Sequence, residues 1–454
     1  MSLWPDRRLL ASLLGATAVA AVAVALPPLV PVAAAAALAL AALAVWDAWQ
    51  LVRHAPLRAE RVLPARAFVD QEAWIELRLA HEGAAPLRAG FRDELPSDVA
   101  PVEPRADGLV VAPGVPTVVR YAVRPSARGD RALGPVWVFA GSPLGLFRRR
   151  AAHADGAVLR VYPDTARLLR AAALDPKRLL AVLGRKPARR RGDGMEFESL
   201  RDYVPGDDPR RLDWAASARR ARPVVRVHQH ERNHAVMIAI DSSRLMAARS
   251  APRARAGAAE GAAPTVARSK LDCAVESTLA LTLAALGTGD RVGLAVFDRA
   301  VRVWLPPRAR RAELGAFVEA LRPVRARPVE ADYGALLGAL AARQRSRALI
   351  VLLTDFVEAE SARLAEPIAV LARRHRLLLV AIRDPLYAEL ETPAARGGPA
   401  ALQRRIVLDD LLHERETALA ALRRRGVETL DLFPEAITAP LLNRYLALRY
   451  GPER

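Results

Sequence analysis

The chain has 454 residues, a formal net charge of +19 and a single cysteine. This length is too great for one ordinary hydrophobic core and predicts two or three domains. The lone Cys273 excludes an intramolecular disulfide framework and a zinc ribbon. All but three of the basic residues are arginines, and the arginines are scattered instead of lining one element. We therefore do not expect nucleic-acid binding.

Residues 1–54 are dominated by an uncharged stretch. No residue from Leu9 to Trp46 carries a charge, which makes 38 residues, whereas one helix needs about 20 to cross a bilayer. The sequence "PPLVP" at Pro27–Pro31 interrupts this run, because proline fixes φ and removes a backbone donor. The pattern predicts a transmembrane helical hairpin.

Charges flanking this hairpin predict its orientation. Arg7 and Arg8 precede the first span and Arg53 follows the second, while the turn carries no charge. The positive-inside rule then predicts a multi-pass protein of the inner (cytoplasmic) membrane, with both termini and the soluble domains in the cytoplasm. A cleaved signal peptide is the alternative, and the long second apolar run argues against it.

Residues 55–165 alternate with period two. In "AWIELRLAHEG", Ile75, Leu77 and Leu79 face one side and the residues between them face the other, which is typical of a half-buried strand. Similar short stretches recur between Gly and Pro clusters. The segment predicts a small β-sandwich, and nothing in it has catalytic spacing.

Residues 166–227 are predicted to be a charged linker. Acids and bases interleave around the turn sequence "VPGDDP", with apolar residues threaded between them. Directional Arg–carboxylate pairs favour an ordered ion-pair lattice packed on the next domain over a simply solvated face. The linker supplies the candidate partner-binding residues, which are Glu196, Arg201, Tyr203, Asp207, Asp208, Arg210, Asp213 and Trp214.

Residues 228–454 alternate between strands and helices. The apolar runs "AVMIAI", "RVGLAVF", "ALIVLLT", "RLLLVAI" and "VETLDLF" are separated by helical stretches at 271–286, 333–343, 361–374 and 408–425, with a last one at 440–449. This order predicts a doubly wound, Rossmann-like α/β domain with a mainly parallel sheet. "VRVWLPP" predicts an antiparallel edge strand, and residues 247–269 a mobile insertion.

Two aspartates end strands of this domain. Asp241 follows "IAI" and Asp355 follows "LLT". In open α/β sheets ligands bind beyond the carboxyl ends of the strands. We therefore expect both side chains at one edge, around a crevice that binds a partner.

The segment "GDGMEFESLRDYVPGDDPRRLDWAASARR" resembles the signature of a family of unknown function, DUF58. The upstream "RGDRALGPVWVFAGSPLGLFRRR" and the downstream "LLTDF" fit the same family's pattern. The resemblance implies membrane proteins that end in a von Willebrand factor A-like domain and that accompany AAA+ ATPases of the MoxR type. It implies no established reaction.

The same resemblance implies a degenerate metal site. Von Willebrand A domains that bind Mg²⁺ use Asp-x-Ser-x-Ser, a threonine and a further aspartate; Asp241, Ser243 and Asp355 match three of these positions. Leu245 replaces the second serine, and Asp332 or Tyr333 stands near the threonine position. Asp332 could add a carboxylate, and water could fill gaps in an Mg²⁺ shell. The alternative, which the two losses favour, is that Asp241 and Asp355 cap helices and hydrogen-bond the loops.

The expected function is a membrane-anchored protein-interaction module, a partner of a MoxR-type AAA+ ATPase in assembling or remodelling protein complexes. The chain has no G-x-S-x-G elbow, P-loop or H-E-x-x-H motif, so we do not expect an enzyme. Two alternatives stay open: a metal-dependent adhesion-type receptor facing outward, and a hydrolase with an unrecognised site.

Overall fold

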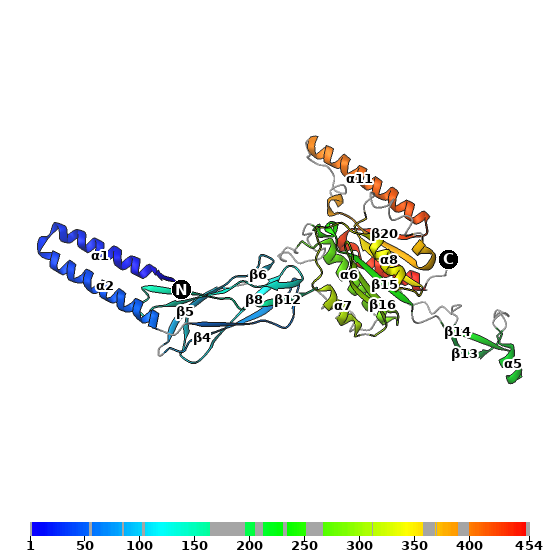
Figure 1. Cartoon of the computed structure of the whole chain (residues 1–454), viewed down its shortest axis with the longest axis horizontal. Coiled ribbons are helices and arrows are strands. Elements are labelled where there is room, and N and C mark those ends of the chain that lie inside the picture. Colours follow the sequence, from blue (N-terminus) through cyan, green and yellow to red (C-terminus); the bar gives the residue numbers. More distant parts are fainter. Residues whose placement is uncertain are drawn as a thin grey trace. The chain divides into compact units, whose positions relative to one another are not determined.

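The computed structural model divides the chain into two compact units, Met1–Tyr162 and Pro163–Arg454 (Figure 1). The described residues are 2–53, 57–83, 86–101, 105–163, 196–204, 212–229, 234–250, 267–310, 312–356, 368, 370–388 and 399–450.

The first unit begins with two long apolar helices. After strand β1 (Ser2–Pro5), Asp6 caps α1 (Arg7–Ala25) by accepting a hydrogen bond from the Arg7 backbone N–H. A 3₁₀ turn at Pro27–Leu29 leads into α2 (Val30–Arg53), which packs beside α1. Both helices are long and apolar enough to cross a membrane. The predicted pair of apolar helices, broken at the proline cluster, is confirmed.

Three sheets make up the rest of this unit, ordered β1-β11-β10-β5-β7, β2-β4-β8-β6 and β3-β12-β9. Their strands are β2 (Arg58–Val62), β3 (Ala67–Phe68), β4 (Ala73–Ala80), β5 (Leu87–Asp93), β6 (Val99–Pro101), β7 (Arg105–Val111), β8 (Thr117–Pro125), β9 (Gly129–Ala132), β10 (Val136–Gly141), β11 (Phe147–His153) and β12 (Val158–Tyr162).

The sheets share one core. Ile75, Leu77 and Leu79 of β4 are fully buried and belong to the same cluster as Phe91 of β5 and Val138 of β10. The intervening β4 residues are more exposed, so the alternation predicted for this strand is confirmed. The inner faces of two sheets thus pack on each other, as in a sandwich.

The ends of the two helices are held to the sheets of this unit. Strand β1 precedes α1, yet it pairs with β11, which follows α2 in the chain. Asp47, near the end of α2, is fully buried and accepts hydrogen bonds from the Leu144 N–H (2.8 Å) and the Leu146 N–H (3.2 Å). Residues 2–5 therefore belong to the sheet, which a boundary at residue 54 did not anticipate.

The second unit begins with a small antiparallel pair of strands. β13 (Glu196–Asp202) pairs with β14 (Val224–Gln229), and α5 (Trp214–Arg220) lies between them in the chain. The charged linker predicted over 166–227 thus contains two strands and a helix among its described residues. A boundary at 227/228 also falls inside β14.

A six-stranded sheet forms the centre of the unit, in the order β17-β16-β15-β18-β19-β20. All neighbouring strands are parallel except β16 and β17, which are antiparallel. The strands are β15 (Ala235–Asp241), β16 (Arg291–Phe297), β17 (Val301–Arg308), β18 (Ala348–Thr354), β19 (Arg376–Ile382) and β20 (Glu428–Leu432).

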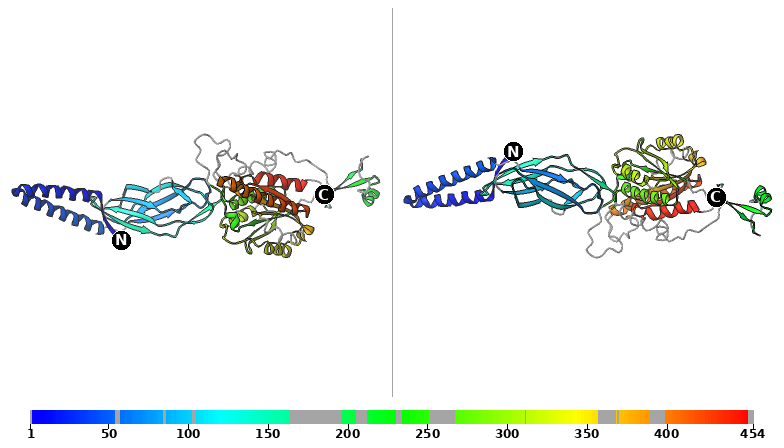
Figure 2. Two further views of the ribbon diagram at one scale, coloured as in Figure 1. Left: turned by 90° about the horizontal axis from the view of Figure 1, so that it is seen from above. Right: turned by 90° about the horizontal axis from the view of Figure 1, so that it is seen from below.

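Helices cover both faces of this sheet (Figure 2). One face packs on α6, α7 and α12, and the other packs on α8 and α11. Their bounds, with those of the short 3₁₀ helices, are α6 (Lys270–Gly287), α7 (Glu313–Leu321), α8 (Tyr333–Arg343), α11 (Pro399–Arg424), α12 (Thr438–Tyr450), η3 (Arg244–Ala247), η4 (Pro385–Tyr387) and η5 (Pro434–Ala436).

The predicted α/β architecture of residues 228–454 is confirmed, including the antiparallel edge strand at "VRVWLPP". Helix α7 was not predicted, and α11 begins nine residues before the predicted start at Leu408. Most of the helix expected at 361–374 lies outside the described residues.

The predicted insertion at 247–269 has a closed base. Arg249 and Ser269 form an antiparallel bridge, and the Ser250 N–H donates to the Arg268 carbonyl at 2.9 Å. Its middle, residues 251–266, lies outside the described residues. The insertion thus starts and ends beside the first turn of α6.

Candidate functional site

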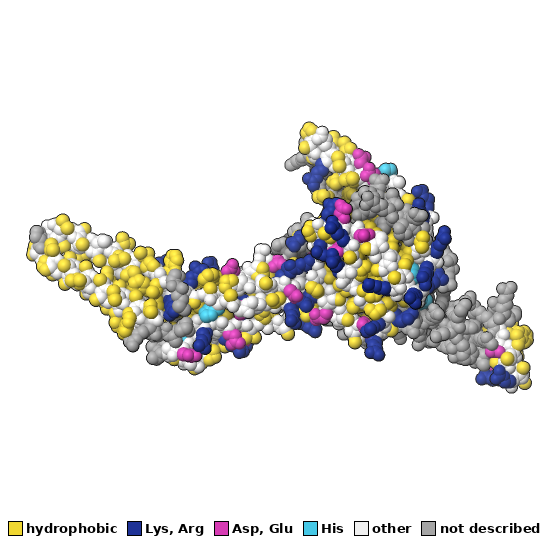
Figure 3. All heavy atoms as spheres, in the orientation of Figure 1, with side chains coloured by type: hydrophobic (Ala, Val, Ile, Leu, Met, Phe, Trp, Pro, Cys, Tyr) yellow, Lys and Arg dark blue, Asp and Glu magenta, His cyan; other side chains and the backbone are white. Residues whose placement is uncertain are grey.

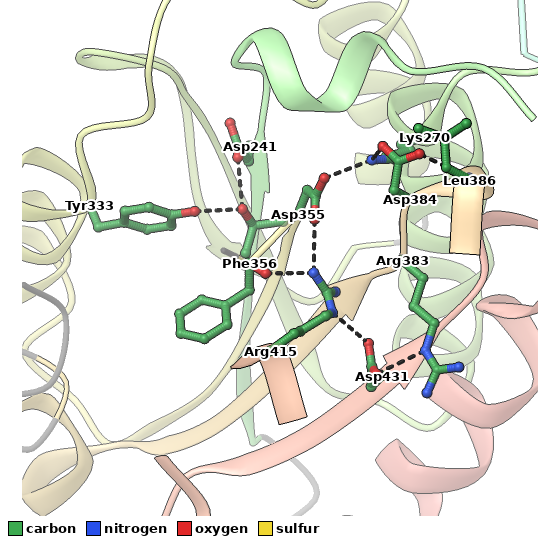
Figure 4. A network of polar contacts seen from close by, with 11 residues as sticks. Asp241, Lys270, Tyr333, Asp355, Phe356, Arg383, Asp384, Leu386, Arg415 and Asp431 are labelled. Carbon is green, nitrogen blue, oxygen red and sulfur yellow. Dashed lines mark hydrogen bonds and ion pairs between the residues drawn. The ribbon is translucent and has the colours of Figure 1, made fainter. Parts of the chain in front are cut away.

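The sheet brings the two strand-ending aspartates together at its carboxyl edge. β15 and β18 are neighbouring parallel strands, with Ile240 opposite Leu353, so Asp241 and Asp355 follow at the same edge. The strand order reverses between these two strands, because β16 and β17 lie on one side of β15 and β18 on the other. Such a reversal is where open α/β sheets place their ligand sites. Figure 4 shows the polar network there.

Asp241 is fully buried and surrounded by neutral donors. Its carboxylate accepts hydrogen bonds from the Ser243 N–H and the Thr354 hydroxyl, both at 2.7 Å. Burial raises the pKa of Asp241, and the hydrogen bonds from Thr354 and Ser243 offset only part of that effect. Ser243, which matches the metal-binding pattern, is also buried and lies beside Asp241.

Tyr333, and not Asp332, reaches this group. The Tyr333 hydroxyl is 2.7 Å from the Thr354 hydroxyl, which in turn donates to Asp241. Asp332 is exposed and caps α8 by accepting from the Ala335 N–H at 3.0 Å. Asp332 therefore makes the capping contact expected of a residue before a helix, and the tyrosine supplies the hydroxyl of the second loop.

Asp355 has a different environment, because two cations hold it. Its Oδ2 lies 2.6 Å from Nζ of Lys270, the first residue of α6, and its Oδ1 lies 3.0 Å from a guanidinium nitrogen of Arg415 on α11. Lys270 also lies 2.7 Å from Asp384 Oδ2. Lys270 is fully buried, and Arg415 and Asp355 are each about 95% buried.

The network extends across the sheet through Arg415. Its Nε lies 3.1 Å from Asp431 of β20, and Asp431 also pairs with Arg383 at 2.8 Å. Charge-assisted hydrogen bonds of this kind are the directional ones, so they fix the relative positions of α6, α11, β18 and β20 (Figure 4). Neither Lys270 nor Arg415 was predicted as a site residue.

A divalent metal does not fit these residues. Mg²⁺ requires near-octahedral oxygen ligands, but both oxygens of Asp355 face cations. Among the described residues no three His, Cys, Asp or Glu side chains are grouped as metal ligands. The helix-capping role expected of Asp355 falls on residues 357–367, which lie outside the described residues; among the described ones Asp355 pairs with Lys270 and Arg415.

Three arginines lie at the exposed surface of this edge, and each is paired with a carboxylate, Arg244 with the exposed Glu330 at 3.3 Å. The buried Asp298, which follows β16, pairs with Arg302 at 2.8 Å and with Arg327 at 3.1 Å. The Arg327 and Arg244 backbone N–H groups donate to Ser242 and Val329, which places both arginines beside the loop after β15. The side chains of Arg244, Arg302 and Arg327, here named the arginine rim, are 58, 47 and 51% exposed.

The predicted partner-binding residues fall on β13, on α5 and between them. Asp213 caps α5 by accepting from the Ala216 N–H at 3.0 Å, and Trp214 is 73% exposed. Tyr203 is half-buried, and Glu196 and Arg201 lie on β13. Asp207, Asp208 and Arg210 lie outside the described residues. An ion pair between Asp202 and Arg222 in this segment is exposed on both sides.

Comparison with known proteins finds one family. The family model "Protein of unknown function DUF58" matches residues 199–402, a range that contains α5, Asp241 and Asp355. The resemblance to this family is therefore confirmed over that range. The von Willebrand A-like assignment and the ATPase partner are not part of that description.

Uncharacterized proteins of Mycobacterium bovis and Mycobacterium tuberculosis are 28% identical to this chain over 201 residues. The match covers 44% of this chain and 58% of each relative. A conserved hypothetical protein BatB from Bacteroides thetaiotaomicron matches 48% of this chain and 100% of its own at 14% identity, with a TM-score of 0.32. Native α2-macroglobulin from Escherichia coli matches 24% of this chain and 17% of its own at 17% identity, with a TM-score of 0.20.

Proposed function

We propose that this protein is a membrane-anchored protein-interaction module. In this proposal the two apolar helices cross the inner membrane and the α/β domain docks a protein partner at the carboxyl edge of its sheet. The observation that supports docking over catalysis is how the charged side chains at that edge are paired and exposed. Its two aspartates are buried and committed to internal hydrogen bonds and ion pairs, while the arginine rim is exposed.

The pairing of β1 with β11 supports a hairpin anchor. β1 lies before α1 and β11 after α2, so both outer helix ends meet one sheet and lie on the same side of any membrane they cross. Removal of α1 as a signal peptide would also remove β1 from that sheet. Trp4, Trp46 and Trp49 are 44–58% exposed near these helix ends, and tryptophan is enriched at membrane interfaces. Hydrophobic side chains cover the helices (Figure 3).

Orientation follows from the flanking arginines, which place both termini and both soluble parts in the cytoplasm. Reporter fusions placed after residue 163 and at the C-terminus test this directly. Both are expected to be active as cytoplasmic fusions and inactive as exported ones. The reverse pattern would favour the outward-facing receptor.

The proposed α/β domain is of the von Willebrand factor A type, and the partner is an AAA+ ATPase of the MoxR type. The strand order with one antiparallel edge strand supports the first assignment, and the family resemblance supports the second. The partner's docking surface is expected to carry acidic side chains, because the three half-exposed arginines Arg244, Arg302 and Arg327 share only two paired carboxylates, those of Glu330 and Asp298.

Co-purification tests the partner. The full chain is extracted from its native membrane in detergent, and retained proteins are identified by mass spectrometry. An AAA+ ATPase is expected with the wild type and is expected to be lost from the double variant Arg244→Glu/Arg327→Glu. Arg120→Glu is the matched control, since Arg120 is 69% exposed in the sandwich. Failure to retain an ATPase, or equal retention by the rim variant, contradicts the proposal.

A further inference from the structure

Lys270 places a positive charge inside the protein at the carboxyl edge of the sheet. Its ammonium nitrogen lies 2.6 Å from Asp355 Oδ2 and 2.7 Å from Asp384 Oδ2, and the side chain is fully buried. The two carboxylates come from different segments, one after β18 and one before η4 (Figure 4). A buried lysine is tolerated only where carboxylates of this kind offset its desolvation.

The backbone around Lys270 holds the ammonium in place. Ser269 and Asp272 form a capping box at the start of α6, and the Lys270 N–H donates to the Ala248 carbonyl at 2.9 Å. The next residue, Leu271, is buried in the core. The Lys270 side chain therefore extends from a backbone position that these hydrogen bonds fix.

Lys270 and Arg415 together exclude a divalent ion from Asp355. Both face the same carboxylate, at 2.6 and 3.0 Å. Two unit charges 4 Å apart repel by about 4 kcal/mol at an effective dielectric constant of about 20, and a divalent ion doubles that figure for each neighbouring cation. An ion at Asp355 would have to displace at least one of them.

We infer that the Lys270 ammonium takes the place of a metal ion at this edge, so that the wild-type domain works without a divalent cation. Removal of the ammonium leaves Asp384 and the Oδ2 atom of Asp355 facing an unfilled gap, while Arg415 keeps its contact with Asp355 Oδ1. The same two carboxylates then form a site for a divalent cation with water as its remaining ligands, since hard cations take carboxylate oxygens and keep water readily.

Mn²⁺ binding to the full chain in detergent, followed by electron paramagnetic resonance, tests this inference. Mn²⁺ is titrated to about 1 mM, the weak end of protein sites for hard cations. Wild type is expected to show no saturable binding, and Lys270→Ala to bind one ion per chain. Adding Asp384→Asn to Lys270→Ala is expected to abolish that binding.

Two matched variants separate the effect of the lysine's positive charge from the effect of the volume that its side chain fills. Lys270→Arg keeps a cation at the position, and Lys270→Met fills it without a charge, so neither is expected to bind Mn²⁺. Saturable binding of one ion by wild type that is lost in Asp355→Asn would overturn the inference, and so would a folded Lys270→Ala that binds none.

Lys270→Ala is destabilised by its unpaired carboxylates, so the titration is also followed as thermal unfolding. If this variant unfolds without added ion, its refolding on addition of Mn²⁺ supports the inference, and no refolding up to the same concentration contradicts it. The midpoint of wild type is expected to be the same in Mg²⁺ and in chelator.

Discussion

The two edges of the central sheet bury carboxylates in different ways. At the amino edge, Asp290 precedes β16, is fully buried, and accepts from the Tyr445 hydroxyl and from Arg449, both on α12. At the carboxyl edge, Asp241 has only neutral donors, while Asp355, Asp384 and Asp431 share Lys270, Arg415 and Arg383.

This difference separates a structural contact from a candidate functional one. The amino-edge cluster joins one helix to the sheet, and a single carboxylate meets a single cation there. The carboxyl-edge cluster gathers four carboxylates against three cations. Burial raises the pKa of Asp290 at the amino edge as well as that of Asp241 at the carboxyl edge, so the excess of carboxylates, and not the pKa, distinguishes the carboxyl edge. Unbalanced buried charge costs stability, and in proteins it gathers at functional sites.

The largest expected effect is that of Arg415→Ala. This change leaves Asp355 and Asp431 without the guanidinium that joins them, and breaking a buried pair from one side costs about 3–5 kcal/mol. We expect a lower thermal midpoint and loss of the co-purified ATPase. Arg244→Ala is the control for stability, because an exposed ion pair contributes about 0–1 kcal/mol. Equal midpoints for the two variants would contradict the prediction.

Arg449→Ala tests the opposite edge and should cost somewhat less, about 3 kcal/mol, because Asp290 keeps its contacts with the Tyr445 hydroxyl and the His234 N–H. The thermal midpoint of the full chain measures it. Unlike Arg415→Ala, this variant is expected to retain the ATPase at a temperature where it is folded. Loss of the partner would show that the two edges do not differ in function.

Acid should weaken the amino edge through His375, which lies just before β19. Burial lowers the pKa of His375 below 6.5, and the nearby Arg374 charge lowers it further. Neither ring nitrogen has a hydrogen-bond partner among the residues that the structure describes. His375 therefore binds a proton more readily in the unfolded chain than in the folded one. The stability that the neutral imidazole contributes is complete above about pH 6.5 and is lost as the pH falls through the pKa of His375 in the folded protein.

The measurement is the unfolding free energy of wild type and His375→Leu as a function of pH. One proton changes this energy by at most about 1.4 kcal/mol per pH unit. The wild-type value should fall relative to that of the variant below pH 6.5. Parallel curves would mean that His375 is not protonated on unfolding.

Much of the fold was predictable because it follows from local patterns. Continuous apolar runs ending in Asp241 and Asp355 place both residues at one edge once the strands are parallel, and "PPLVP" marks the turn between the helices. By contrast, β1 was missed because four residues before an apolar run have no periodicity to detect. Strand β13 was missed because "MEFESLRD" lies among dense charges.

The site was predicted less completely, since its cations come from distant segments. Lys270 is 85 residues from Asp355 and Arg415 is 60 residues from it, and no sequence spacing links them. One signal was present: Lys270 is one of only three lysines in a chain rich in arginine, and it follows a serine at a helix start.

The smallest expected effect is that of Tyr333→Phe, which tests whether Asp241 depends on its neutral donors. The change removes the hydroxyl 2.7 Å from Thr354 and leaves the Thr354 donation to Asp241 in place. One hydrogen bond contributes about 0.5–1.5 kcal/mol, so the thermal midpoint should fall only slightly. Thr354→Val removes the donor to Asp241 itself and should cost more. If Tyr333→Phe costs as much as Arg415→Ala, the neutral and charged halves of this edge form one cooperative network, and the separation between Asp241 and Asp355 does not hold.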